Sequence, residues 1–178
     1  MALGLGLLAR RRGRREAVSR VYRAIVERSR EQHFFLAWGM PDTLDGRFEL
    51  LALHAFLVLN RFKSERASTA EFAQDLFDTM FADLDRTVRE MGATDIGVGR
   101  HVKAMAQGFY GRIAAYDAGL AGGDAGLRDA LRRNLFGTVA PAEAQLAAAA
   151  HYLRAQAAAL RAAPLQTLLS GAVPYAPI

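Results

Sequence analysis

One nearly uninterrupted apolar segment, RFELLALHAFLVLNRF at residues 47–62, constrains the fold most strongly. Apolar side chains fall on almost every side of a helix drawn through it, and a helix buries all of its faces only when other elements surround it. The segment is shorter than the roughly 20 apolar residues that a membrane-spanning helix needs. It therefore predicts a central helix of a globular protein.

Helical periodicity continues on both sides of this segment. Apolar residues recur at steps of three and four, and no stretch alternates for long enough to indicate a strand. We expect helices over residues 15–31, 47–62, 69–91, 98–120, 124–136 and 141–161. The length of 178 residues suits one domain. The prediction is an all-α, single-domain helical bundle of about six helices, spanning residues 15–170 and followed by an irregular tail at 171–178.

Local signals refine the expected boundaries. Ser68 and Glu71 have the spacing of a capping box that opens the helix 69–91, and Gly92 is a typical end for it. Pro141 suits the first turn of the last long helix. The only tryptophan, Trp38, lies in an aromatic loop. Such a loop is either packed into the core or exposed as a contact surface, and we expect it in the core.

Positive charge is concentrated at the N-terminus. Residues 1–30 contain nine arginines and two glutamates, whereas residues 31–178 contain 14 basic and 16 acidic side chains. We expect residues 1–14 to form a flexible basic arm, because glycines interrupt any helix before Arg15. A basic arm suits anionic lipid, ribosomal RNA or an acidic protein surface, and a disordered solubilising tail is the alternative. The candidates for membrane or ribosome contact are Arg10, Arg11, Arg12, Arg14 and Arg15.

Residue types that carry catalysis or bind cofactors are sparse. There is no cysteine, which excludes disulfides, thiolate zinc sites and cysteine nucleophiles. The four histidines are scattered without metal-ligand spacing, and we predict no metal, no cofactor and no enzymatic activity. A row of carboxylates follows the helix 69–91 and is expected to be a solvated face: Glu71, Asp75, Asp78 and Asp85. His54, in the most apolar helix, is expected to be a hydrogen-bonded core residue, with axial haem ligation as the alternative.

Two cations lie at the expected start of the helix 98–120, where carboxylates are normally preferred. Helical spacing places Arg100 and Lys103 on the outward face, and the opposite face is apolar. The cations are candidates to bind carboxylates or phosphates of a partner, and Asp95 is the alternative local counter-charge. The apolar face consists of Val102, Met105, Phe109 and Ile113.

Two blocks of sequence resemble the ubiquinol–cytochrome c chaperone family. They are PDTLDGRFELLALHAFLVLNR at residues 41–61 and DIGVGRHVKAMAQGFYGRIAAYDAG at 95–119, in the family's order. The resemblance extends over about residues 15–135 and is strongest at FYGR, which contains Tyr110 and Arg112. We add these two residues to Arg100 and Lys103 as candidate partner-binding residues.

The resemblance implies a helical, non-enzymatic assembly factor of respiratory complex III with no catalytic residues. Its client would be cytochrome b or a complex III assembly intermediate, and mitochondrial members also act with a small partner subunit near the ribosomal tunnel exit. The implied location is the bacterial cytoplasm at the inner membrane, or the matrix side in a mitochondrion. Two other functions remain open from the residues alone: a peripheral membrane or RNA-binding module that uses the arginines, and a haem-binding protein that uses His54.

Overall fold

The computed structural model describes residues 2–90 and 95–178, with side chains placed from Leu8 onward except at 95 and 96. These residues form α1 (Ala2–Ser29), α2 (Gln32–Leu36), α3 (Leu44–Lys63), α4 (Arg66–Glu90), α5 (Asp95–Ala121), α6 (Asp124–Arg133), α7 (Glu143–Ala162) and α8 (Leu165–Leu169). No strand occurs among them. The predicted all-α fold is confirmed, and the six expected helices correspond to the six elements that are longer than five residues.

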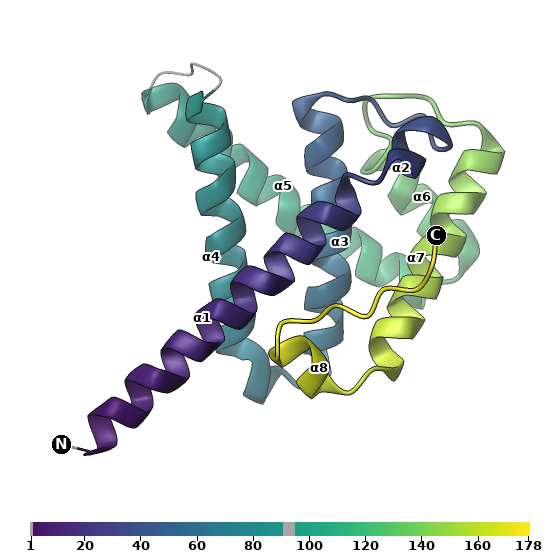
Figure 1. Cartoon of the computed structure of the whole chain (residues 1–178). Coiled ribbons are helices and arrows are strands. Elements are labelled where there is room, and N and C mark those ends of the chain that lie inside the picture. The colour runs from purple at the N-terminus through teal and green to yellow at the C-terminus, as the bar shows by residue number, and fades with distance from the viewer. Residues whose placement is uncertain (1, 91–94) are drawn as a thin grey trace.

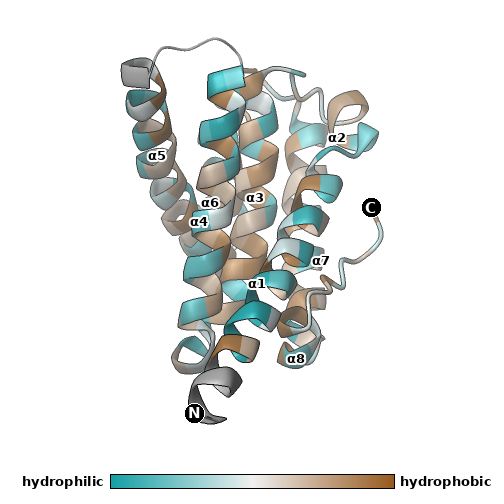
Figure 2. Ribbon diagram, turned by 60° about the vertical axis from the view of Figure 1, so that its left-hand side comes forward, coloured by the Kyte–Doolittle hydropathy of each residue, from teal (hydrophilic) through white to brown (hydrophobic). Residues whose placement is uncertain are grey.

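The helix α3 lies at the centre of the bundle, as its sequence predicted (Figure 1). Residues 48–58 are all buried, and Figure 2 shows hydrophobic residues concentrated along this helix. Thr43 caps its N-terminus by accepting a hydrogen bond from the Gly46 backbone N–H at 3.2 Å. Gly46 has to be glycine, because a Cβ atom there would lie 2.1 Å from the carbonyl oxygen of Pro41.

The faces of α3 contribute to two hydrophobic clusters. One cluster joins α3 to α2, α6, α7 and the C-terminal half of α5, and it contains Trp38, which is 2% exposed. The other joins α3 to α1, α4, α8 and the N-terminal half of α5. The expectation that Trp38 packs in the core is confirmed.

The helix α1 is continuous from Ala2 and projects beyond the rest of the bundle at its N-terminal end (Figure 1). The prediction that glycines interrupt a helix before Arg15 is therefore wrong. The leucines, alanines and arginines between those glycines favour helix, and adding residues to an existing helix costs little compared with nucleating one. Arg14 also pairs with two side chains of α4: its Nε donates to Asp75 at 2.6 Å, and it contacts Glu71.

Two predicted helix starts are wrong. The helix α4 begins at Arg66, so Ser68 lies inside it, where its hydroxyl donates to the Glu65 carbonyl at 3.0 Å instead of capping. The helix α7 begins at Glu143, so Pro141 precedes the first turn, and the Ala142 N–H donates to the Gln145 side chain at 2.8 Å. The expected end of α4 at Met91 and Gly92 lies outside the described residues.

The C-terminal segment after α8 is extended and lies along the bundle, as Figure 1 shows in yellow. Gln156 of α7 binds it through both of its amide atoms: its oxygen accepts from the Ala176 N–H at 2.8 Å, and its nitrogen donates to the Ala176 carbonyl at 3.0 Å. Arg28 of α1 donates to the same carbonyl. The tail is thereby attached to two helices although it forms none itself.

Candidate functional site

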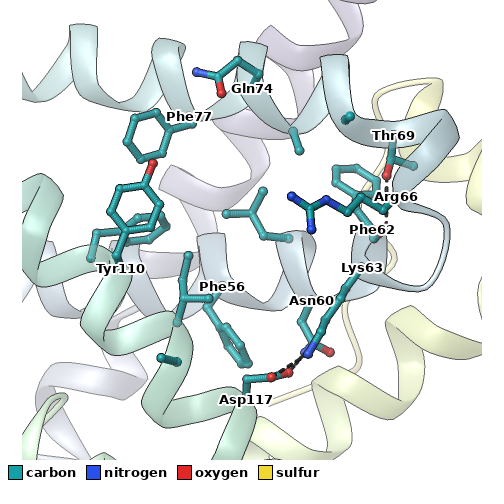
Figure 3. Close-up of a pocket in the computed structure, with 16 residues that line it drawn as sticks. Phe56, Asn60, Phe62, Lys63, Arg66, Thr69, Gln74, Phe77, Tyr110 and Asp117 are labelled. Atoms are coloured by element: carbon teal, nitrogen blue, oxygen red, sulfur yellow. Dashed lines mark hydrogen bonds and ion pairs between the residues drawn. The ribbon is translucent and has the colours of Figure 1, made fainter.

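The candidate functional site is a groove of about 510 Å³ between the C-terminal half of α3, the N-terminal half of α4 and the middle of α5 (Figure 3). Its floor is apolar. The side chains that form the floor are Phe56, Leu59, Phe62, Phe77, Phe109 and Ile113. Because three helices each supply part of this floor, the groove depends on how the bundle packs.

A stacked aromatic pair, the exposed Tyr110 and the half-buried Phe77, borders the groove at one end. The Tyr110 ring stacks on Phe77, with ring centroids 5.5 Å apart and planes inclined by 27°. Phe77 in turn contacts the buried Phe109, at 6.0 Å between centroids. Tyr110 is nevertheless 59% exposed, so its ring presents a large apolar surface to solvent or to a partner.

Polar side chains border the other end of the groove. Asp117 of α5 accepts hydrogen bonds from Lys63 Nζ at 2.6 Å and from Asn60 Nδ2 at 3.1 Å. Arg66 extends over the groove from the start of α4 (Figure 3). No carboxylate of the described residues pairs with its guanidinium. The charge of Asp117 is thus compensated, and that of Arg66 is not.

An exposed stripe of α5 leads from the N-terminal part of that helix into the groove. Its residues follow one another at steps of three and four: Arg100, Lys103, Gln107, Tyr110 and Ala114, all of them exposed. A helix rises 1.5 Å per residue, so about 15 Å separates Arg100 from Tyr110 along the axis. Neither cation has an ion-pair partner in the described part of the chain. The predicted outward face is confirmed, and so is the apolar face opposite, where Met105 and Phe109 are buried.

The position of these cations relative to the helix end differs from the prediction. The helix α5 begins at Asp95, which places Arg100 in its second turn rather than its first. The helix dipole acts mainly on the first turn, so it has little influence on Arg100 and Lys103. The side chain of Asp95, the alternative counter-charge, lies outside the described residues.

Arg112, the fourth predicted partner-binding residue, does not join this stripe. Its Nε donates to Glu49 Oε2 of α3 at 2.5 Å, its Nη2 contacts the other carboxylate oxygen, and its guanidinium lies 5.3 Å from the centre of the Phe48 ring. Burial raises the pKa of Glu49, and Arg112 opposes that rise. Arg112 thus holds α5 to α3 from inside the bundle.

The predicted N-terminal cations contribute nothing to the groove. Arg10, Arg11, Arg12 and Arg15 are exposed on the projecting end of α1, and Arg12 donates to Glu16 at 3.0 Å. Arg14 is half-buried because it binds α4. The two sets of predicted contact residues therefore lie on different helices and do not form one site.

His54 lies in the core with both ring nitrogens engaged. Nδ1–H donates to the Leu50 carbonyl at 2.7 Å, and the Tyr152 hydroxyl donates to Nε2 at 2.9 Å. Burial lowers the pKa of His54 to about 4, so the ring is neutral at physiological pH. With neither nitrogen free, the alternative of axial haem ligation is wrong. The expectation of a hydrogen-bonded core histidine is confirmed.

Many acidic side chains of the described residues take part in ion pairs and hydrogen bonds and are not gathered into a metal site. No cluster of three or more histidines and acidic side chains within 2–90 and 95–178 has the arrangement of a metal site. The predicted row of carboxylates on α4 is divided among local partners: Asp78 accepts from Gln74, Asp85 from Arg89, and Asp75 from Arg14. Sequence analysis did not identify Arg66 or Phe77 as site residues, because neither carries a local signal that separates it from other residues of α4.

Comparison with known proteins identifies related chains. Residues 36–175 match the family described as ubiquinol-cytochrome C chaperone. The ubiquinol-cytochrome c reductase complex assembly factors 1 of mouse and human are each 31% identical over 140 residues, which is 79% of this chain. They are covered to 48% and 47%, so the chain spans about half the length of these relatives.

A solved structure supports the same relationship over the whole fold. The crystal structure of the Cbp3 homolog from Brucella abortus is 34% identical in sequence, with a TM-score of 0.86 and coverage of 99% of this chain and 97% of that one. The matched relatives are named as chaperones and assembly factors rather than as enzymes, in agreement with the expectation from the sequence. The chain belongs to the ubiquinol–cytochrome c chaperone family.

Proposed function

We propose that this protein is a non-enzymatic chaperone for the assembly of ubiquinol–cytochrome c reductase, respiratory complex III. Its client is cytochrome b, which it holds as a hydrophobic membrane protein during biogenesis. The observation that carries the proposal is the family match over residues 36–175, together with the likeness to the Brucella abortus Cbp3 homolog over nearly the whole chain. The sequence resemblance at residues 41–61 and 95–119 points to the same client.

The chemistry of the described surface is compatible with holding a client. A chaperone of this kind needs accessible apolar surface and no reacting groups. Leu36 is 81% exposed, and the half-buried Phe35 lies beside it, away from the groove that Tyr110 borders. Binding through such surfaces is reversible, as the release of a client requires.

A deletion strain of the organism that encodes this chain tests the proposal. Assembled complex III should fall strongly on native gels, and newly labelled cytochrome b should be degraded faster, whereas succinate dehydrogenase should be unchanged. Re-expression of the full chain should restore both. Normal complex III in the deletion strain would refute the assembly function. Loss of the complex with a normal lifetime of cytochrome b would instead refute the choice of client.

We further propose that the projecting part of α1 contacts an anionic surface at the site of cytochrome b synthesis, on the cytoplasmic side of the bacterial inner membrane or its mitochondrial equivalent. The exposed positions of Arg10, Arg11 and Arg15 support this proposal. In the described part of the chain, none of the helices combines the length and apolar character needed to cross a bilayer. The contact would be electrostatic, so its strength should fall steeply with salt.

Sedimentation with vesicles and with ribosomes distinguishes the two surfaces. Vesicles with and without anionic lipid, and purified ribosomes, should be tested at low and at physiological salt with the full chain. A variant with Arg10, Arg11 and Arg15 changed to glutamine should lose the interaction. Equal sedimentation of that variant would refute a role for these arginines.

A further inference from the structure

We propose that the groove between α3, α4 and α5, together with the exposed stripe of α5, is a docking site for an amphipathic helix of a partner protein that carries acidic side chains. The inference goes beyond the proposed client and does not depend on it. It follows from three features: the apolar floor with the exposed Tyr110 at its border, the helical walls whose backbone groups are mostly paired already, and the uncompensated positive charge.

The walls of the groove indicate that the occupant is helical. All three walls are helices, so most of their backbone N–H and C=O groups are paired within each helix, and at the junction of α3 and α4 the Phe62 carbonyl accepts from the Glu65 N–H and the Thr69 hydroxyl. An extended peptide on the apolar floor would bury its own backbone groups without partners, which is costly. A helix satisfies its backbone internally and presents side chains at i, i+3, i+4 and i+7 to such a groove. The floor side chains, with Phe77 and Tyr110 at one end, would receive those anchors.

The charges around the groove indicate that the occupant is acidic. Asp117 is satisfied by Lys63 and Asn60, whereas Arg66 has no ion-pair partner among the described residues. Arg100 and Lys103 extend the positive charge along the same face of α5. Most arginines near the bundle's helix contacts, such as Arg14 and Arg112, are paired internally. Unpaired cations beside an apolar groove attract carboxylates and set their register on the surface.

The size of the groove favours a short helix over a membrane-spanning helix as its occupant. A volume of about 510 Å³ is in the range of pockets that hold one small ligand, so it accepts a few anchoring side chains. A membrane-spanning helix presents about 30 Å of apolar length, which such a groove cannot cover. The site thus suits a short helix of a soluble subunit or of a loop, and client holding requires other surface.

Photo-crosslinking in cells with the full chain tests the proposal. The residue p-benzoylphenylalanine replaces Tyr110, which keeps an aromatic ring at the border of the groove, and the attached peptide is identified by mass spectrometry. We expect a protein segment with apolar residues at helical spacing and at least one aspartate or glutamate one turn away. Attachment to lipid, to a second copy of this chain or to a segment without a carboxylate would overturn the proposal, and so would the absence of any adduct.

A charge exchange adds the second arm of the test. Arg66→Glu, introduced into the crosslinking chain, should reduce the yield about tenfold, and changing the partner's carboxylate to arginine should restore it. Arg23→Glu is the matched control, because Arg23 is exposed in the middle of α1 and does not line the groove. Its yield should be unchanged. Equal losses in Arg66→Glu and Arg23→Glu would overturn the proposal, as would an unaffected yield in Arg66→Glu. Both variants should keep the wild-type melting temperature, because neither arginine has a partner to lose.

Discussion

Replacement of His54 with leucine is expected to remove much of the acid sensitivity of the fold. The side chain is fully buried, and burial lowers its pKa from 6.5 to about 4. Between pH 6.5 and pH 4 the unfolded chain binds a proton that the folded chain does not, so the free energy of unfolding decreases as the pH falls through this range. The contribution of His54 is complete above pH 6.5 and decreases as the pH falls toward 4. The loss is about 2 kcal/mol at pH 5 and about 3 kcal/mol at lower pH.

The same substitution has a cost at neutral pH. Leucine leaves the Tyr152 hydroxyl without the acceptor that Nε2 provides at 2.9 Å. An unsatisfied donor in the core costs about 1–3 kcal/mol, and the added apolar contact of leucine offsets part of it. The wild type should therefore be more stable at pH 7.5, and the two proteins should approach equal stability near pH 5. His54→Asp should be destabilised by several kcal/mol at neutral pH, because its carboxylate would be buried and the nearby Arg28 is already bound to Tyr152 and the Ala176 carbonyl.

Urea unfolding followed by circular dichroism between pH 4.5 and 8 measures these differences. The predicted result is a steeper decline of the unfolding free energy for the wild type than for His54→Leu. Parallel curves for the two proteins would refute the pKa argument. Comparable stability of His54→Asp and His54→Leu at pH 7.5 would refute the conclusion that this position is sealed from water.

Three further predictions concern charged residues. Arg112→Leu should lower the free energy of unfolding by about 3–5 kcal/mol at pH 7.5, because it leaves Glu49 buried without its partner. The loss should shrink in acid, where the raised pKa of Glu49 allows its carboxyl group to become neutral. A loss that does not depend on pH in urea titrations would contradict this explanation. The free energy of unfolding of the double variant Arg100→Glu, Lys103→Glu should lie within about 0.5 kcal/mol of the wild-type value, since both residues are exposed and lie beyond the first turn of α5. If Arg100 and Lys103 contact a partner, the double variant should also fail to restore complex III in a deletion strain. Full restoration by the double variant would show that these two cations are not part of the site. Deletion of residues 2–13 should leave the bundle folded by circular dichroism and reduce vesicle or ribosome binding, and a large loss of helix beyond the deleted residues would show that the segment is structural.

The sequence predicts those parts of the fold that depend on local pattern. The unbroken apolar run of α3 indicated a central helix, and residues 48–58 are indeed buried. Phe72, Leu76 and Met80 of α4 recur at steps of four, and all three are buried. Helix starts were less predictable. Ser68 and Glu71 have capping-box spacing, but α4 already begins at Arg66, so both residues lie inside the helix. Glu71 pairs with Arg14 instead.

The site was predictable only in part, because its components are far apart in the sequence. Helical spacing placed Arg100 and Lys103 on the outward face of α5, and the structure confirms that face. The family resemblance at FYGR added Tyr110, which lies on the same face, and Arg112 as candidates for partner contact. The ion pair of Arg112 with Glu49 spans 63 residues and depends on how α3 and α5 pack, which no periodicity reveals. Arg66 and Phe77 become site residues for the same reason.

The distribution of charge shows how packing changes a conclusion drawn from the sequence. Counted along the chain, the excess of arginine in residues 1–30 and the carboxylate row of α4 look like two independent surfaces. In the bundle α1 packs against α4, and Arg14 pairs with Asp75 and Glu71 of that row, so part of the excess charge is used to hold two helices together. Among the candidate contact cations, those without such carboxylates in the described part of the chain form two groups: Arg10, Arg11 and Arg15 of α1 on one side, and Arg66 with Arg100 and Lys103 of α5 on the other. Because these two groups lie on different helices, they can engage different partners. A variant that loses one interaction should therefore keep the other.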